Sequence, residues 1–200
     1  MPAEPGSQQN PLKITDPRAM RALAHPARIA MLQHLALEGP STATDCAEVV
    51  GLSASACSYH LRELAKYGFV EEDAGSAADG RHRPWRARVV AVSLDSEPGR
   101  SGAIRSAGRL LLDSVQARFD EVRSRYLDAE SEYPQQWQAA AGARHDVVHV
   151  TPDELTELRS SIADLVSGYR RLDRAQRSPG ARLVHALIDF TPGFAPDGDR

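Results

Sequence analysis

The chain has 200 residues, a formal net charge of −3 and 42% hydrophobic residues. That apolar content suffices for a core, and the acidic balance argues against a surface that coats nucleic acid non-specifically, so any DNA site must be a local patch. No apolar run approaches the ~20 residues that cross a bilayer, the start lacks an apolar signal core, and only Cys46 and Cys57 occur, so we expect a soluble cytoplasmic protein without a disulfide framework.

Two short helices are predicted after a flexible tail of residues 1–15. Asp16 can cap the first helix, which starts at Pro17. The second helix spans about 27–38 and is ended by Gly39. Its apolar residues recur at helical spacing: Ile29, Leu32 and Leu35.

A third helix and a tight turn come next. Ser41 or Thr42 can cap this helix, and Asp45 stands three residues after Thr42, where a capping-box partner belongs. Gly51 can adopt the left-handed conformation that ends a helix, and Ser53 can start another. This spacing predicts a helix-turn-helix.

The fourth helix, 54–67, divides into two faces. The predicted buried face carries Ala54, Cys57, Leu61, Leu64 and Ala65, and the opposite face carries Ser55, Tyr59, Arg62 and Lys66. A strand should begin over 69–72, and alternation over 85–92 predicts a second strand. Arg86 and Arg88 lie opposite Trp85, which we expect to pack at the hairpin base. A hairpin after such a helix is a wing.

The second half begins with a linker over 93–102 and a long helix over 103–129. An apolar side of this helix requires a partner: Ile104, Leu111, Val115, Phe119, Val122 and Tyr126. Residues 135–141 could add helical turns.

A strand-helix-strand module is predicted over 146–190. Its strands are 146–150 and 182–190, and its helix, capped by Thr151, runs to about residue 174. It is consistent with an effector-binding module and equally with a structural cap on a dimer. A flexible tail follows over 191–200. The predicted fold class is α+β, mainly α: a winged helix-turn-helix with a long dimerisation helix and a small C-terminal extension.

Four motifs over 16–92 resemble the ArsR-type family of winged-helix regulators. They are the HPAR of residues 25–28, the SASACSYHL of residues 53–61, the GFV of residues 68–70 and the GRHRPWR of residues 80–86. The resemblance implies a homodimer joined through the first helix and the helix after the wing. Two recognition helices would then enter major grooves about 34 Å apart on a near-palindromic operator.

The resemblance also implies the DNA contacts. Residues that would face bases or nearby phosphates are Ser53, Ser55, Ala56, Ser58, Tyr59 and His60. Residues that would hold the backbone or the minor groove are Arg62, Lys66, Arg81, His82, Arg83 and Arg86. His60 could equally be a packed residue at the helix edge, and the wing arginines could be a solvated loop.

The chain departs from relatives that sense metals. Thr42 and Thr44 stand where a Cys-x-Cys would supply thiolates, and residues 103–129 contain no His, so we expect neither a metal response nor a cofactor. His145 and His149 would stand about 13 Å apart on a strand. Cys46 and Cys57 are interpreted as small buried hydrophobes, with redox sensing as the alternative.

The function predicted from these patterns is sequence-specific DNA binding by a transcriptional regulator, with repression favoured because a bound dimer blocks polymerase. The expected partners are double-stranded DNA, a second copy of the chain and an unidentified small-molecule effector, with no membrane. The alternative is a winged-helix module for dimerisation or protein docking, as found at the N-terminus of some methyltransferases. Those enzymes need a G-x-G-x-x-G turn after a strand, and this motif does not occur in the sequence. No nucleophile elbow, zinc-hydrolase motif or phosphate loop supports an enzyme.

Overall fold

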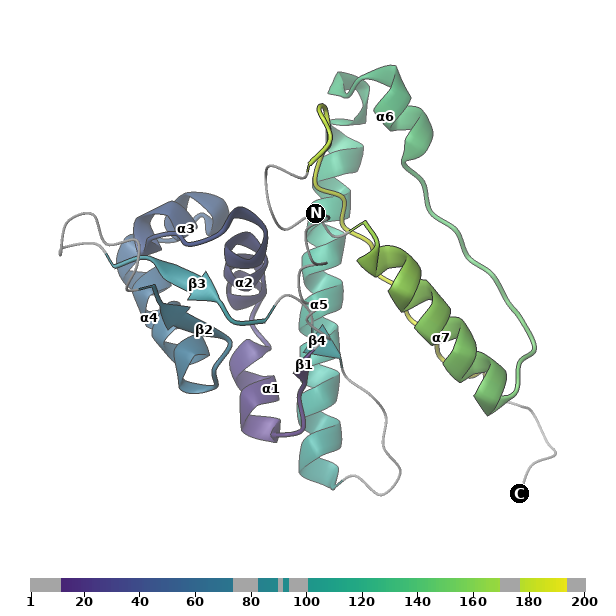
Figure 1. The fold of residues 1–200 in the computed structure, drawn as a ribbon, viewed down its shortest axis with the longest axis horizontal. Coiled ribbons are helices and arrows are strands. Elements are labelled where there is room, and N and C mark those ends of the chain that lie inside the picture. The colour runs from purple at the N-terminus through teal and green to yellow at the C-terminus, as the bar shows by residue number, and fades with distance from the viewer. Residues whose placement is uncertain (1–11, 74–82, 90–91, 94–100, 170–176, 194–200) are drawn as a thin grey trace, which may run out of the picture.

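The computed structural model describes residues 12–73, 83–89, 92–93, 101–169 and 177–193. Their helices are α1 (Pro17–Leu23), α2 (Pro26–Glu38), α3 (Ala43–Val50), α4 (Ala54–Lys66), α5 (Gly102–Asp128), α6 (Gln135–Ala140) and α7 (Pro152–Ser167). Their strands are β1 (Leu12–Lys13), β2 (Val70–Glu72), β3 (Trp85–Ala87) and β4 (Val92–Ser93), and one 3-10 turn covers Glu130–Glu132. Helices α1 to α4 and the β2–β3 hairpin gather on one side of the long α5, and α7 lies on its other side (Figure 1). None of the described helices is both long and apolar enough to span a membrane.

Polar side chains begin the helices where the sequence predicts them. Asp16 accepts a hydrogen bond from the backbone N–H of Arg18 at 2.8 Å, directly before α1. At α3, Thr42 Oγ1 accepts from the N–H of Asp45 at 3.2 Å, and the Asp45 carboxylate accepts from the N–H of Thr42 at 2.8 Å. Such caps pair N–H groups that have no partner inside the helix and stabilise it by about 1 kcal/mol each. The choice left open between Ser41 and Thr42 is therefore decided for Thr42.

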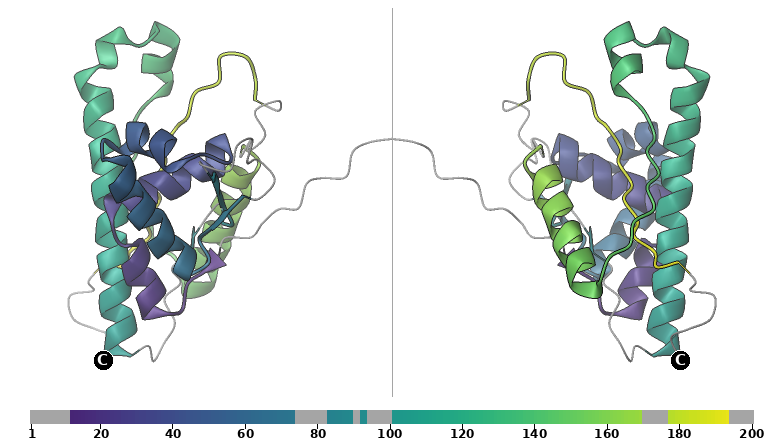
Figure 2. Two further views of the ribbon diagram at one scale, coloured as in Figure 1. Left: turned by 90° about the vertical axis from the view of Figure 1, so that its left-hand side faces the viewer. Right: turned by 90° about the vertical axis from the view of Figure 1, so that its right-hand side faces the viewer.

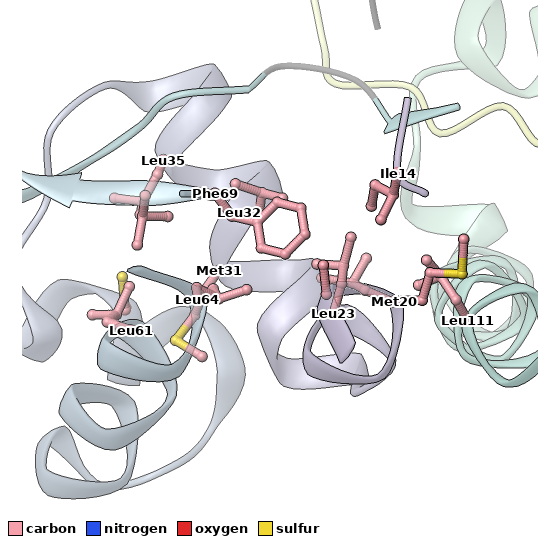
Figure 3. Packing of buried hydrophobic residues seen from close by; sticks show 14 of the residues in the cluster. Ile14, Met20, Leu23, Met31, Leu32, Leu35, Leu61, Leu64, Phe69 and Leu111 are labelled. Atoms are coloured by element: carbon pink, nitrogen blue, oxygen red, sulfur yellow. The ribbon is translucent and has the colours of Figure 1, made fainter. Parts of the chain in front are cut away.

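One hydrophobic core joins α1, α2, α4 and the start of the wing (Figure 3). Its fully buried large side chains include Met20, Met31, Leu61, Leu64 and Phe69. Phe69 enters this core because Gly68, at φ +73°, turns the chain back directly after α4. Burying side chains of this size contributes about 1.5–3 kcal/mol each.

The long helix α5 packs the first half of its apolar side against the same core. Ala107 and Leu111 are each 1% exposed, and Ile104 and Val115 pack beside them. The neighbours of this half are α1 and α2. The first half of the predicted apolar side of α5 is therefore confirmed, with the first two helices as its partner within the chain. Three residues of the second half, Phe119, Val122 and Tyr126, are half-buried.

The folded chain begins earlier than the predicted boundary at residue 16. Leu12–Lys13 pairs in parallel with Val92–Ser93, and Ile14 is 4% exposed in the core. The expected tail of residues 1–15 therefore has to be corrected over 12–15. The strand expected over 85–92 is also shorter, because β3 ends at Ala87 and the chain further on pairs with β1 instead.

In the C-terminal half the predicted helix forms but its two predicted strands do not. Thr151 and Glu154 make the expected capping box at the start of α7. Residues 146–150 and 182–190 have no ladder partner among the described residues, and Figure 2 shows them as extended chain without strand arrows. The alternation of apolar residues is present, but a strand also needs a neighbour that satisfies its backbone N–H and C=O groups. Helix α7 ends at Ser167, whereas the sequence predicts that it runs to about residue 174. Residues 170–176 lie outside the described part of the chain.

Two side chains join the last described segment to the rest of the chain. Arg177 Nη1 donates to Glu38 Oε1 at the end of α2, at 3.1 Å. The Arg182 guanidinium lies 5.2 Å from the ring centre of Tyr133 and 5.9 Å from that of Trp137, within range of a cation–π contact with both. Residues 177–193 therefore contact both α2 and the region around α6.

Candidate nucleic-acid interface

The helix-turn-helix is formed by α3, a three-residue turn and α4. Gly51 has φ +68° and ends α3 in the left-handed conformation, as predicted. Ser53 then caps α4, because its Oγ accepts from the N–H of Ala56 at 3.2 Å. The oxygen of Ser53, one of the candidate DNA contacts, is therefore already engaged in holding the start of α4.

Helix α4 has the two faces that the sequence predicts. Cys57, Leu61 and Leu64 are fully buried. The four residues of the opposite face are all exposed, and we refer to them as the α4 stripe: Ser55, Tyr59, Arg62 and Lys66. Tyr59 is 53% exposed, which is unusual for so large an aromatic side chain.

The remaining candidates on α4 are less accessible than the stripe. Ala56 and Ser58 are half-buried on the flank of the helix. Ala54, placed by the sequence on the buried face, is exposed because it is the first residue of α4 and projects beyond the core.

His60 lies at the edge between the two faces and contacts α2. Its Nδ1 accepts a hydrogen bond from Nε of Arg28 at 3.2 Å, and its ring centre lies 4.7 Å from that of His25. Burial together with the positive charge of Arg28 and the neighbouring His25 lowers the pKa of His60. The sequence analysis missed Arg28 and His25 as members of the site, although both belong to the HPAR motif.

In the wing, the arginines are paired with glutamates of the neighbouring strand. Arg86 Nε donates to Glu71 Oε1 at 2.7 Å, Arg88 Nε lies 3.4 Å from Glu71 Oε2, and Arg83 Nη1 donates to Glu72 at 3.0 Å. All three arginine side chains are more than half exposed, and exposed pairs of this kind are worth only about 0–1 kcal/mol. The pairs can therefore open at small cost when a phosphate competes for the cation.

The hairpin itself has the predicted orientation. Glu71 pairs with Arg86 in the antiparallel register of β2 and β3, and Trp85 is half-buried against the core, as expected for a residue at the base of the wing. Arg81 and His82, two further candidate contacts, lie outside the described residues.

The two cations of the α4 stripe differ in their surroundings. Lys66 forms an ion pair with Glu63, which raises the pKa of Lys66 and lowers that of Glu63. Arg62 forms no ion pair with another described residue. The stripe thus offers one unpaired guanidinium and one ammonium that already has a carboxylate beside it.

The two cysteines are part of the core beneath the stripe. Both thiols are free and fully buried, on α3 and α4. Burial raises the pKa of Cys46 to about 12 and also raises that of Cys57. Because the thiolate is the reactive form, this environment fits the interpretation as packing residues.

Residues 23–73 match a family model described as a helix-turn-helix domain. The matched range contains α2, α3, α4 and β2, and so includes the turn and the whole α4 stripe. No curated protein is similar to the chain at a significant level.

Several solved structures are similar at low identity. The winged helix-turn-helix DNA-binding domain of Mb0332 from Mycobacterium bovis, a possible ArsR-family regulator, is 19% identical, with 59% of this chain and 85% of that chain covered and a TM-score of 0.31. An apo mutant of ZitR from Lactococcus lactis is 16% identical, with 74% and 84% covered and a TM-score of 0.31. Wild-type ZitR in complex with DNA is 14% identical, with 80% and 81% covered and a TM-score of 0.29.

These overlaps are too small to transfer individual residues. The assignment of the fold uses the family match and the geometry instead. The geometry consists of α3, a turn that begins at Gly51, α4, and a β-hairpin directly after α4. The chain therefore contains a helix-turn-helix domain in its winged form, the fold implied by the resemblance to ArsR-type regulators.

Proposed function

We propose that the protein is a transcriptional regulator that binds double-stranded DNA sequence-specifically as a homodimer, and that it acts as a repressor without responding to metals. The observation that carries this proposal is the α4 stripe, an exposed polar and aromatic face on the second helix of a helix-turn-helix. In proteins of this architecture that helix lies in the major groove.

The stripe has the chemistry that base edges and phosphates require. The hydroxyls of Ser55 and Tyr59 can donate to or accept from base edges, and the guanidinium of Arg62 can bind phosphate or the acceptor pair of guanine. Tyr59 stands near the middle of the stripe, where a side chain can reach bases rather than only the backbone. We therefore assign Tyr59 to sequence reading and Lys66, nearer the end of α4, to the backbone.

The charge of the molecule favours specific over indiscriminate binding. The chain carries a net charge of −3, and the described wing arginines are already paired with Glu71 and Glu72. A phosphate must displace these carboxylates before the wing contributes. We expect weak binding to arbitrary DNA and a marked gain where the stripe finds its bases.

The exposed side of α5 supports self-association. Leu112 and Leu127, 55% and 58% exposed, lie about 60° apart around α5 and away from Leu111 in the core, whereas Leu110, 47% exposed, lies on the opposite flank of the helix. The domain of Mb0332 is described as homodimeric. A two-fold pairing along α5 would present two α4 helices, and their entry into successive major grooves requires them to lie about one DNA turn, roughly 34 Å, apart. A near-palindromic operator follows from that symmetry.

The absence of a metal response is proposed from the chemistry of α3. Thr42 uses its hydroxyl and backbone in the capping box with Asp45, and Thr44 is an exposed alcohol that does not supply a soft ligand. Control by an effector would then fall to the C-terminal half.

The experiment that tests the function is selection of bound duplexes from a random pool, followed by fluorescence polarisation against the selected and a scrambled sequence at two salt concentrations. The proposal expects a symmetric consensus and at least a hundredfold preference, in line with specific binders. Equal affinity for both duplexes would contradict sequence-specific binding and favour a winged-helix module for protein docking.

A further inference from the structure

The contact between α2 and α4 at His60 defines the state of its imidazole ring. Arg28 donates from Nε to Nδ1 of His60 at 3.2 Å and from Nη1 to the backbone carbonyl of Ala22 at 2.6 Å. The guanidinium is thus held by acceptors on two elements, α1 and α4. The bond to Ala22 holds the guanidinium beside His60.

An imidazole nitrogen that accepts a hydrogen bond carries no proton. Because arginine is always a donor, Nδ1 of His60 must be unprotonated and a neutral ring must carry its proton on Nε2. The neighbouring His25 is in the same state, since its Nδ1 accepts from the N–H of Ala27 at 3.2 Å and caps α2. Two neutral rings with 4.7 Å between their centres are therefore part of the joint between α2 and α4.

The proton on Nε2 of His60 is left for an external acceptor. None of the hydrogen bonds between described residues involves this atom. Among the described residues, the buried side-chain atoms that lack a hydrogen-bond partner are Gln33 Oε1 and Arg118 Nε. Nε2 of His60 also lacks a partner but is not one of these buried atoms, so it is accessible to solvent. Its ring also touches that of Tyr59 in the stripe, with 5.5 Å between ring centres in an edge-on arrangement.

We propose that Arg28 is a positioning residue for DNA reading: it holds His60 as the neutral Nε2–H tautomer, so that His60 presents a single uncharged donor beside Tyr59 to an acceptor on a base edge. This inference rests on the proposed function. The acceptors that fit are O6 or N7 of guanine, N7 of adenine and O4 of thymine, whereas the amino group of cytosine does not fit.

The surrounding charges are consistent with a neutral ring. Two groups disfavour a proton on Nδ1 of His60: His25, which caps α2, and Arg28, which lies within α2. The Glu63 carboxylate, one turn further along α4, would favour such a proton. Glu63 is paired with Lys66, which reduces its influence. An uncharged hydrogen-bond donor can distinguish one base edge from another, but it is only weakly attracted to the charged phosphates. His60 should therefore add to sequence specificity more than to general DNA affinity.

The tautomer can be measured without DNA by nitrogen-15 NMR of the histidine side chains in the full chain. We expect His60 in the wild type to show a protonated Nε2 and an unprotonated Nδ1 at pH 7.5, and the Arg28→Ala variant to show a mixture. A mixed or Nδ1-protonated ring in the wild type would overturn the proposal, and this result needs no variant to fold.

The reading role is tested by a double-mutant cycle on the selected duplex. We expect Arg28→Ala to weaken binding about five- to tenfold in the wild-type background, as for the loss of one base contact, and to have no further effect in a His60→Ala background. Equal losses in both backgrounds would show a merely structural role for Arg28 and overturn the proposal. If Arg28→Ala unfolds, Arg28→Gln replaces it, because glutamine keeps a side-chain donor and is expected to retain part of the affinity.

The two proposals can fail separately. A wild type without preference for any duplex would contradict the proposed function and the reading role together. A single Nε2–H tautomer that is lost in Arg28→Ala would still support the positioning of His60 by Arg28.

Discussion

Arg86 on β3 donates to Glu71 on β2 at 2.7 Å, and the same glutamate also lies within 3.4 Å of Arg88. One carboxylate thus neutralises two of the wing cations. We expect Glu71→Gln to strengthen binding to arbitrary DNA about two- to fivefold at low salt, because it releases both arginines for phosphate, and to steepen the salt dependence. Polarisation at several salt concentrations measures both. Glu157→Gln on α7 changes the net charge equally and serves as the control; an equal gain in that variant would show an effect of net charge alone.

Removing the side chain of Tyr59 should reduce specificity. Because Tyr59 is exposed in the middle of the α4 stripe, we expect Tyr59→Ala to weaken binding to the selected duplex about fivefold, the worth of one net hydrogen bond of about 1 kcal/mol. Binding to scrambled DNA should change little. Tyr169→Ala, at a tyrosine that is 76% exposed next to α7, is the matched control. Unchanged specificity in Tyr59→Ala would remove this residue from the reading surface.

Two adjacent leucines of α5 should behave in opposite ways. Leu111 is 1% exposed in the core, and Leu111→Ala should lower the free energy of unfolding by about 2–5 kcal/mol, measured by urea denaturation at fixed protein concentration. Leu112 is 55% exposed in the single chain and lies on the side proposed for self-association, so Leu112→Ala should change the free energy of unfolding by less than about 0.5 kcal/mol at concentrations where the chain is a monomer. A loss of stability in Leu112→Ala that appears only at higher protein concentration would support burial of Leu112 against a second chain, and a comparable loss in both variants at every concentration would contradict its exposed position.

The histidine pair makes stability depend on pH. The pKa values of His25 and His60 are both lowered, chiefly by burial, from an ordinary value of 6.5. Between the lowered value and 6.5 the unfolded chain binds more protons than the folded one, so the free energy of unfolding should be highest above pH 6.5 and fall as the pH drops below it. Urea denaturation between pH 7.5 and 5.5 measures this slope.

A double variant serves as the control for the pH dependence of stability, because it keeps a hydrogen-bond acceptor at each position and removes both titrating imidazoles. His25→Asn retains an oxygen that can cap α2, and His60→Gln retains one that can accept from Arg28. The double variant should therefore show a flatter profile, with a residual slope from His185, whose pKa is also lowered by burial. An unchanged profile would contradict the assignment of the pH dependence to this pair.

Metals should not alter DNA binding. We expect the affinity for the selected duplex to be the same with added Zn²⁺, with arsenite and with a chelator, because the alcohols of Thr42 and Thr44 do not supply thiolate ligands. Polarisation titrations under the three conditions measure it. A tenfold shift by either metal would refute the metal-independent mechanism.

The helices of the N-terminal half were predictable because their signals are local. A cap, its box partner and a left-handed glycine lie within a few residues of each other, as at Thr42, Asp45 and Gly51, and their geometry hardly depends on the rest of the fold. The exposed face of α4 followed in the same way from helical periodicity. Which of its residues contact DNA remains a prediction.

The sequence by itself thus determined where most helices start, which face of α4 is exposed and that a hairpin follows it. Only the tertiary structure decided that residues 12–15 join the core, that residues 146–150 and 182–190 lack strand partners, and that Glu71 covers the wing arginines. It also brought Arg28 to His60, 32 residues further along the chain. Capping and periodicity act over one or two turns, whereas a strand pair or an arginine–histidine contact joins distant segments, and its partner is chosen only when the whole core packs.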